Sequence, residues 1–502
     1  MRFRKYITFI LIVVTAVCIV HAQELSHVNV TTLLQDDFDQ SLDMLGIGGN
    51  PAWLFQRQLS MPLKIQFLQQ SSSGDYHYAF EPKNSTGYQY SVEGKKDLSA
   101  DHVVYGTFGA VQEYRGDRMW SDTKQYDTWN PMIIADSSTG MTDYRGLVLN
   151  GTYSGLLTDR WLLGATIKYG VDNGVKRVSP KPLDMQRNIG IELGTAFLLT
   201  EKFSLGALLV LKNDKEENDF EPDQTTAQSQ AVLFKFRGYD SYQKFTKNSE
   251  NRIVRTETYG GYIQSAYNSD EVRSAVSAGY KVRFADIVDG GSSPLDQGFC
   301  QSEVMEGTWG GSIVLDSITI CAEAGISKDH QWTRHPNYSV LLVEQNITNA
   351  NAGLCLRVPV FGIDLFGGYS VSFRERLLND YISTLSANIS SYTHMVMIGG
   401  SAMIDEREKA SVWYAMEFVD PAMKRVTVPN PSALYALVGA RNFGYETASV
   451  FGSSAGFDVT FNGGVFGHCS IGGVFRYRET RSSFIFKAAS RSTAEVLFST
   501  DL

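Results

Sequence analysis

The chain has 502 residues, a formal net charge of −9, and 45 glycines, 25 tyrosines and 28 phenylalanines. The acidic balance argues against a nucleic-acid partner, which would require a basic patch. With 43% hydrophobic and 20% charged residues and a mean hydropathy near zero, the chain is neither disordered nor a bundle of membrane-spanning helices. This composition favours a strand-rich protein.

The N-terminus has the pattern of an export signal. A positively charged start, MRFRK, precedes an apolar run from Ile7 to Val20, and Val20-His21-Ala22 offers a cleavage site before Gln23. A membrane-anchoring helix is the alternative, but roughly 14 apolar residues are short for a span of about 20. We therefore expect a signal peptide over residues 1–22.

Residues 23–61 are expected to form a helical segment at the periplasmic mouth of the protein. Leucines and Phe38 recur at helical spacing between Thr31 and Leu45. The stretch GNPAWLF then places Asn50 as a helix N-cap and Pro51 at the first helical position. A disordered leader is the alternative for this segment.

Strict alternation begins clearly at Trp161. The apolar positions are Trp161, Leu163, Ala165, Ile167, Tyr169 and Val171, and the residues between them are mostly small or polar. A period of two indicates an extended strand with one apolar and one polar face. The same pattern returns over residues 188–199, 272–284, 349–358, 361–374 and 470–477. These strands of about 10 to 13 residues exceed the usual length in soluble proteins and suit a bilayer span.

The connections between the strands alternate in length. Short turns are expected at residues 158–160, 200–202, 268–270, 316–317 and 405–409, and long polar loops at residues 115–143, 172–186, 213–256, 285–304, 328–348, 375–390 and 419–433. Short turns at one rim and long loops at the other are typical of outer-membrane barrels, with the loops extracellular. Polar inner faces repeated over many strands cannot form a dry core, so the apolar faces must contact lipid.

The sequence therefore predicts an all-β fold: a transmembrane antiparallel up-and-down β-barrel of about 14 to 20 strands over residues 62–502, which closes so that every backbone group is paired. Tyr144, Trp161 and Phe203 are expected at strand ends as interfacial aromatic residues. The exported chain keeps Cys300, Cys321, Cys355 and Cys469, whose spacing matches no zinc site. We expect buried thiols, with a Cys321–Cys355 disulfide as the alternative.

Three stretches of the chain have motifs that are found in known proteins. GGNPAWLF is similar to an NPAGL element of several outer-membrane barrel families, with Trp53 in place of the usual glycine. Residues 108–155 combine an aromatic strand, Trp120 and the ADSSTG loop at 135–140, and residues 179–194 combine an SPKP loop with the next strand. These two stretches resemble a family of Bacteroidota outer-membrane β-barrels of unknown function, whose DPRP loop has Asp in place of Ser179 and Arg in place of Lys181. The resemblance implies an outer-membrane barrel of about this length and no catalytic residues.

No motif indicates enzymatic chemistry, a cofactor or a metal. His394 near Ser390, and His468 near Ser470, lack a nucleophile motif and an orienting acid. Trp332, Arg334 and His335 on an expected loop could bind a sugar or an anionic headgroup, but ordinary loop packing is the favoured explanation. We expect that the protein is not an enzyme and has no catalytic, cofactor-binding or metal-binding residues.

Ten charged residues are expected to project into the lumen. They are Lys168, Glu192, Arg273, Lys281, Arg283, Glu323, Arg357, Asp364, Arg374 and Arg476. They could line an aqueous path, or they could pair with one another in a closed interior. The preferred interpretation is an outer-membrane channel or transporter for a small solute or lipid in a Gram-negative bacterium, in contact with outer-membrane lipid. The alternative is a non-conducting scaffold for a surface lipoprotein or an envelope complex.

Overall fold

The computed structural model describes residues 49–501, except 57–62, 125–128, 179–180, 221–230, 248–249, 291–292, 339, 406–407, 465–466 and 484. The expected signal peptide and the expected helix between Thr31 and Leu45 lie outside these residues. The described part contains a large sheet, a small sheet and three short helices. None of those helices has the length and apolarity needed to cross a membrane.

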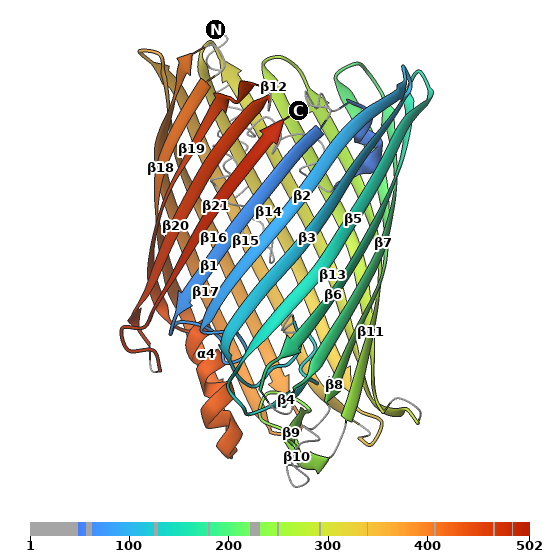
Figure 1. Cartoon of the computed structure of the whole chain (residues 1–502), viewed down its shortest axis with the longest axis vertical. Helices are drawn as coiled ribbons and strands as arrows, with labels where there is room; N and C mark the ends of the chain where they lie inside the picture. The colour runs from blue at the N-terminus through green and yellow to red at the C-terminus, as the bar shows by residue number, and fades with distance from the viewer. Residues whose placement is uncertain are drawn as a thin grey trace.

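Eighteen antiparallel strands form the large sheet. Their bounds are β1 Leu63–Gly74, β2 Asn84–Ser99, β3 His102–Arg118, β5 Gly140–Thr158, β6 Trp161–Lys176, β7 Leu183–Leu198, β8 Phe203–Phe220, β11 Glu250–Asn268, β12 Val272–Asp289, β13 Leu295–Leu315, β14 Ile318–Arg334, β15 Leu341–Val360, β16 Ile363–Asp380, β17 Leu385–Asp405, β18 Glu408–Thr427, β19 Ser449–Asn462, β20 His468–Ser482 and β21 Ser490–Asp501. Each strand pairs with the next one in this order, and β21 pairs with β1, so the sheet closes into a barrel (Figure 1).

The strand number lies within the predicted range, and the predicted fold class is confirmed. Apolar side chains such as Leu193, Ile263 and Leu354 are exposed on the outer surface, while the residues between them face inward. Exposed apolar residues that recur on one strand after another indicate that lipid covers this face of the barrel. The alternation of the sequence therefore determines which face of each strand meets the bilayer.

The strands are longer than the sequence suggested. They run from 12 residues in β1 to 21 residues in β13, so the expected length of 10 to 13 residues was wrong for most of them. The expected loops at 285–304, 328–348 and 375–390 shrink to the connections 290–294, 335–340 and 381–384. Beyond the lipid both faces of a strand meet polar surroundings, so the hydrogen-bond ladder continues there without apolar alternation. The period-two signal ends at the lipid boundary, although the strand does not.

The two rims are nevertheless unequal, as predicted. One rim, here called the turn end, joins strands through short turns such as residues 159–160 and 316–317. The other rim, the loop end, carries the long connections 119–139, 221–249 and 428–448, and it is the lower rim in Figure 1. The small sheet of β4 (Ile134–Asp136), β9 (Ala231–Phe236) and β10 (Tyr242–Lys247) belongs to the loop end, as do η2 (Tyr435–Gly439) and α4 (Ala440–Glu446).

Aromatic rings on the inward face lie flat over glycines of neighbouring strands. A Cβ atom on Gly456 would lie 2.4 Å from the Trp413 ring, and one on Gly399 would lie 2.3 Å from the Phe366 ring. Tyr144 covers Gly174 in the same way and is buried, so the prediction that Tyr144 is an interfacial aromatic residue was wrong. Large rings over glycines fill the space that the missing side chains leave and stiffen the wall.

The described cysteines are buried thiols, and no disulfide joins them. Cys321 and Cys355 occupy directly opposite positions on β14 and β15. The expected buried thiols are therefore the state that the structure shows.

Candidate functional site: the lumen and its lid

The strand register places all ten predicted lumen residues on the inward face. On their strands the adjacent positions carry exposed apolar side chains such as Ile167, Tyr280 and Leu356, which face lipid. The ten residues are spread over β6, β7, β12, β14, β15, β16 and β20 rather than gathered in one cluster. They therefore line a wide surface instead of forming a single binding site.

Two ion pairs form within this set. Lys168 Nζ lies 2.6 Å from Glu192 Oε1, and Arg357 pairs with Asp364. The Lys168 side chain keeps 45% of its surface exposed and Arg357 keeps 38%. An inward charge keeps this exposure only where protein does not fill the lumen, and a barrel of this strand number is too wide for its own side chains to fill. This part of the lumen has room for water or a solute.

Other predicted residues bind carboxylates that the sequence reasoning missed. Lys281 pairs with Glu306 at 3.3 Å, Arg283 with Asp329 at 3.3 Å, and Arg476 with Glu495 at 2.8 Å. Arg273, Glu323 and Arg374 face inward on β12, β14 and β16, and Glu323 lies against Gly353 of β15. Glu306 and Glu495 lie on the neighbouring strand and Asp329 lies two strands away, so finding these partners requires the strand order and register as well as the alternation.

At the loop end a second layer of protein packs against the inside of the barrel wall. We call this layer the inner lid: residues 119–136, of which 125–128 are outside the described part, together with β9 and β10. Its strands form the small sheet at the lower end of the barrel in Figure 1. Trp120 of the inner lid packs against Phe234, and Trp129 and Met132 pack against Ile287, Cys300 and Leu342 of the barrel wall. The inner lid thus reaches from β3 across to β12, β13 and β15.

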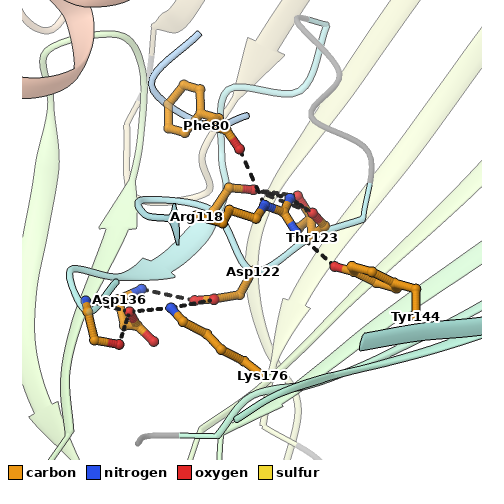
Figure 2. A network of polar contacts seen from close by, with 9 residues as sticks. Phe80, Arg118, Asp122, Thr123, Asp136, Tyr144 and Lys176 are labelled. Atoms are coloured by element: carbon orange, nitrogen blue, oxygen red, sulfur yellow. Dashed lines mark hydrogen bonds and ion pairs between the residues drawn. The ribbon is translucent and has the colours of Figure 1, made fainter. Parts of the chain in front are cut away.

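A buried lysine joins the inner lid to β6. Lys176 Nζ lies 2.7 Å from Asp136 Oδ1 and 3.3 Å from Asp122 Oδ1, and all three side chains are 2% exposed. Figure 2 shows the ammonium group between the two carboxylates. Burial, followed by the repulsion of the Asp136 carboxylate, raises the pKa of Asp122 to about 6. Two lid carboxylates therefore share one wall cation in a dry environment.

Arg118, the last residue of β3, holds the start of the inner lid. It donates hydrogen bonds to the Phe80 carbonyl at 3.3 Å, the Tyr144 hydroxyl at 2.8 Å and the Ser121 hydroxyl at 3.0 Å. A further bond goes to the Thr123 carbonyl (Figure 2). A buried guanidinium group with this many acceptors fixes the direction in which the chain leaves the wall.

A second buried ion cluster fastens the opposite side of the inner lid. Arg252 of β11 binds Asp289 of β12 through two bonds of 2.6 and 3.0 Å and donates to the Met132 carbonyl at 3.0 Å. Lys235 of β9 pairs with Glu250 at 3.1 Å and also with Asp289. Since Arg252 is 3% exposed, the inward charges here are sealed from water, unlike those nearer the turn end.

At the turn end, Asn50, Pro51 and Ala52 form a second contact with the inside of the wall. We call these three residues the anchor segment; Pro51 and Ala52 are also the first two residues of η1 (Pro51–Gln56). Asn50 caps the helix through a 3.0 Å bond from the Ala52 N–H, as predicted. Its amide also donates to the carbonyls of Thr195 and Ala207 at 3.1 and 3.0 Å.

Three glycines of the wall make room for the anchor segment. A Cβ atom would lie 2.3 Å from Pro51 at Gly164, 2.0 Å from Asn50 at Gly194 and 3.0 Å from Asn50 at Gly206. Gly164, Gly194 and Gly206 lie on β6, β7 and β8. Any side chain at the first two positions would displace the anchor segment.

The other side chains considered for chemistry have structural contacts. His394 faces outward, where its Nδ1 lies 2.7 Å from the Tyr369 hydroxyl. Trp332 and Arg334 lie in β14 rather than in a loop, with the guanidinium group 4.9 Å from the Trp332 ring centroid, and His335 is buried. Within the described residues, no group of three or more His, Cys, Asp or Glu side chains is arranged to hold a metal ion.

A closed antiparallel barrel with an apolar outer face, a polar lumen and unequal rims defines a transmembrane β-barrel of the outer-membrane type. The chain belongs to a family of unknown function (DUF6850), whose model matches residues 51–499. Pro51 and Ala52 of the anchor segment, Trp120 and the 135–140 stretch, which carried part of the resemblance in the sequence, lie within that match, and Asn50 lies one residue before it. No curated protein matches the chain.

Solved structures of outer-membrane barrels resemble the fold distantly. The copper transporter OprC is 7% identical with a TM-score of 0.42, covering 88% of this chain and 81% of that one. The FrpB iron transporter from Neisseria meningitidis is 9% identical with a TM-score of 0.42, covering 89% and 82%. A FadL homologue from Pseudomonas aeruginosa is 10% identical with a TM-score of 0.33, covering 90% and 93%. We draw no functional argument from likenesses at this level.

Proposed function

We propose that the protein is exported to the outer membrane of a Gram-negative cell and passes or captures a small solute or lipid through its lumen, with the inner lid as the gate. The observation that carries this proposal is the gradient of exposure along the inward ion pairs. Lys168 and Arg357 are accessible within the lumen, whereas Lys176 and Arg252 at the inner lid are sealed. An accessible chamber closed at one end by a separate layer is suited to controlled passage.

The chemistry of the lumen favours a polar or amphipathic cargo. Arg476 pairs with Glu495 and Arg478 pairs with Glu417 in the half of the barrel nearer the loop end. The partly exposed Met395 and Val474 lie on the inward face of β17 and β20 and pack against the buried cluster of Phe366, Met397 and Trp413. A surface that offers both ion pairs and an apolar patch can contact a solute with a charged and an apolar part.

The gate is tested by locking the inner lid to the wall. Asn130 Oδ1 lies 3.5 Å from the Cys300 sulfur, so Asn130→Cys brings a second thiol within reach of Cys300. We expect wild-type protein in planar bilayers to show conductance steps, oxidised Asn130→Cys to be silent, and dithiothreitol to restore its steps. Asn130→Ser is the matched control, because it loses the same amide but cannot form the disulfide.

Conduction by the oxidised variant at the wild-type level would show that the inner lid is not the gate. Silence of every variant, with a protein that co-purifies in fixed ratio, would instead support the alternative of a non-conducting scaffold for a surface lipoprotein or an envelope complex. We propose that the protein acts by binding and passage and not as an enzyme.

A further inference from the structure

Three cations stand side by side on the outer face of the barrel near the loop end. Arg187 of β7 is directly opposite Lys215 of β8, and Lys215 is directly opposite Arg255 of β11. These strands lie next to one another on the right of Figure 1. Directly opposite residues on one face of an antiparallel pair have Cβ atoms about 4.5–5.5 Å apart. The row Arg187, Lys215 and Arg255 is called the cation row below.

The cation row faces away from the lumen. On the same three strands Ile191, Leu211 and Tyr259 share its face, and all three are exposed. These apolar residues are opposite one another two same-face levels nearer the middle of the barrel, four residues along each strand. Four residues correspond to about 13 Å along a strand. The cation row therefore lies just beyond the apolar band, where lipid headgroups are found.

Carboxylates lie close to the cation row, but among the described residues only Lys215 forms an ion pair with one of them. Glu217 forms an ion pair with Lys215 at 2.5 Å, and Asp286 occupies the position opposite Arg255 on β12. Glu257 lies next to Arg255 on the same face and accepts a hydrogen bond from the Tyr259 hydroxyl at 2.7 Å. Neither arginine forms an ion pair among the described residues. Like charges placed directly opposite destabilise a sheet, so an anion from outside the chain is the simplest reason for this arrangement.

We propose that the cation row binds the phosphate group of a membrane lipid in the leaflet at the loop end. Guanidinium groups bind phosphate oxygens through paired charge-assisted hydrogen bonds, and two arginines flanking a lysine present such donors along one line. The apolar side chains below the row contact the acyl chains of the same lipid. This inference requires the barrel to lie in a membrane but does not require it to conduct.

The test compares two double variants in lipid-binding experiments. Arg187→Gln with Arg255→Gln removes the two arginines of the row. Arg145→Gln with Arg177→Gln is the matched control, because these exposed arginines of the same rim share Asp143 at 3.1 and 3.4 Å. Purified protein is titrated in detergent with phosphatidic acid, phosphatidylcholine or inorganic phosphate, and native mass spectrometry counts bound lipid. The heat-dependent shift in gel mobility checks that each variant is a folded barrel.

We expect phosphatidic acid to bind wild type and the control alike, and to bind the cation-row variant about tenfold more weakly. Phosphatidylcholine is expected to bind all of them weakly. Equal phosphatidic acid binding by the wild type and the cation-row variant would overturn the proposal. Competition by inorganic phosphate at equal concentration would also overturn it, because the site would then recognise the anion without the lipid. Wild-type conductance together with unweakened lipid binding by the cation-row variant would refute this inference alone and leave the proposed function standing.

Discussion

The anchor segment offers the sharpest prediction, because the wall and the segment can be changed independently. Asn50→Ala removes the bond to the Ala52 N–H and the two bonds to the carbonyls of Thr195 and Ala207. At about 0.5–1.5 kcal/mol for each neutral hydrogen bond, the loss is about 2–4 kcal/mol. With tenfold for each 1.4 kcal/mol, the detached state of the anchor segment should become roughly 30 to 1,000 times more populated.

Gly194→Ala disrupts the same contact from the side of the wall, because the new Cβ atom would lie 2.0 Å from Asn50 Oδ1. Gly190→Ala on the same strand is the control, since its Cβ atom would lie at an ordinary 3.5 Å from Lys168. The assay is hydrogen exchange of the peptide covering residues 50–56. We expect faster exchange in Asn50→Ala and Gly194→Ala and no change in Gly190→Ala. Unchanged exchange in the first two variants, with the barrel intact, would refute this account of how the segment is held.

Three further predictions concern the inner lid and the wall. Lys176→Met leaves Asp122 and Asp136 as buried carboxylates without their cation, which should destabilise the closed lid by about 3–5 kcal/mol and lengthen the open time in bilayer recordings; shorter openings would contradict it. The pKa of Asp122 is raised to about 6 in the closed lid, so proton binding favours the closed state. The open probability should therefore fall between about pH 7.5 and pH 5 in the wild type and stay constant in Asp122→Asn. A pH response retained in that variant would point to another titrating group. Gly456→Val would push its side chain into the Trp413 ring, at 2.4 Å, and should lower barrel stability by about 1–3 kcal/mol, measured as a lower temperature for the gel-mobility shift; an unchanged temperature would show that the ring can move.

The strands of the barrel wall were predictable from the sequence because the alternating pattern that specifies them is local in the chain. A strand that separates lipid from a polar lumen must alternate, and the run from Trp161 to Val171 shows that alternation with no knowledge of its neighbours. The N-cap at Asn50 was predictable for the same reason, since the capped N–H lies two residues away. Strand ends such as Lys212–Phe220 were missed, because outside the lipid no solvent difference between the two faces imposes a pattern.

The inner lid was not predictable, because its contacts are distant in the chain. Lys176 meets its carboxylates across 40 and 54 residues, and Arg252 meets the Met132 carbonyl across 120. Tyr144 is an aromatic residue near a strand end, as interfacial residues often are. Its position in the alternation along β5 nevertheless places its side chain on the inward face, where it is buried. Only the register of the closed sheet decides such cases. Trp120 and the 135–140 stretch were noticed through resemblance, but nothing local gave their role.

The chemistry of the inner lid itself favours a moving part over a permanent plug. A buried ion pair is seldom more stabilising than apolar side chains of the same volume, because desolvation cancels much of the attraction. A permanent plug would therefore gain nothing from holding Lys176, Lys235 and Arg252 out of water. In a lid that opens, the same groups are rehydrated, so the open state avoids the large cost that exposed apolar residues would impose. Ion pairs that hold the lid therefore make the free-energy difference between the closed and open states smaller than apolar contacts would, as a gate requires.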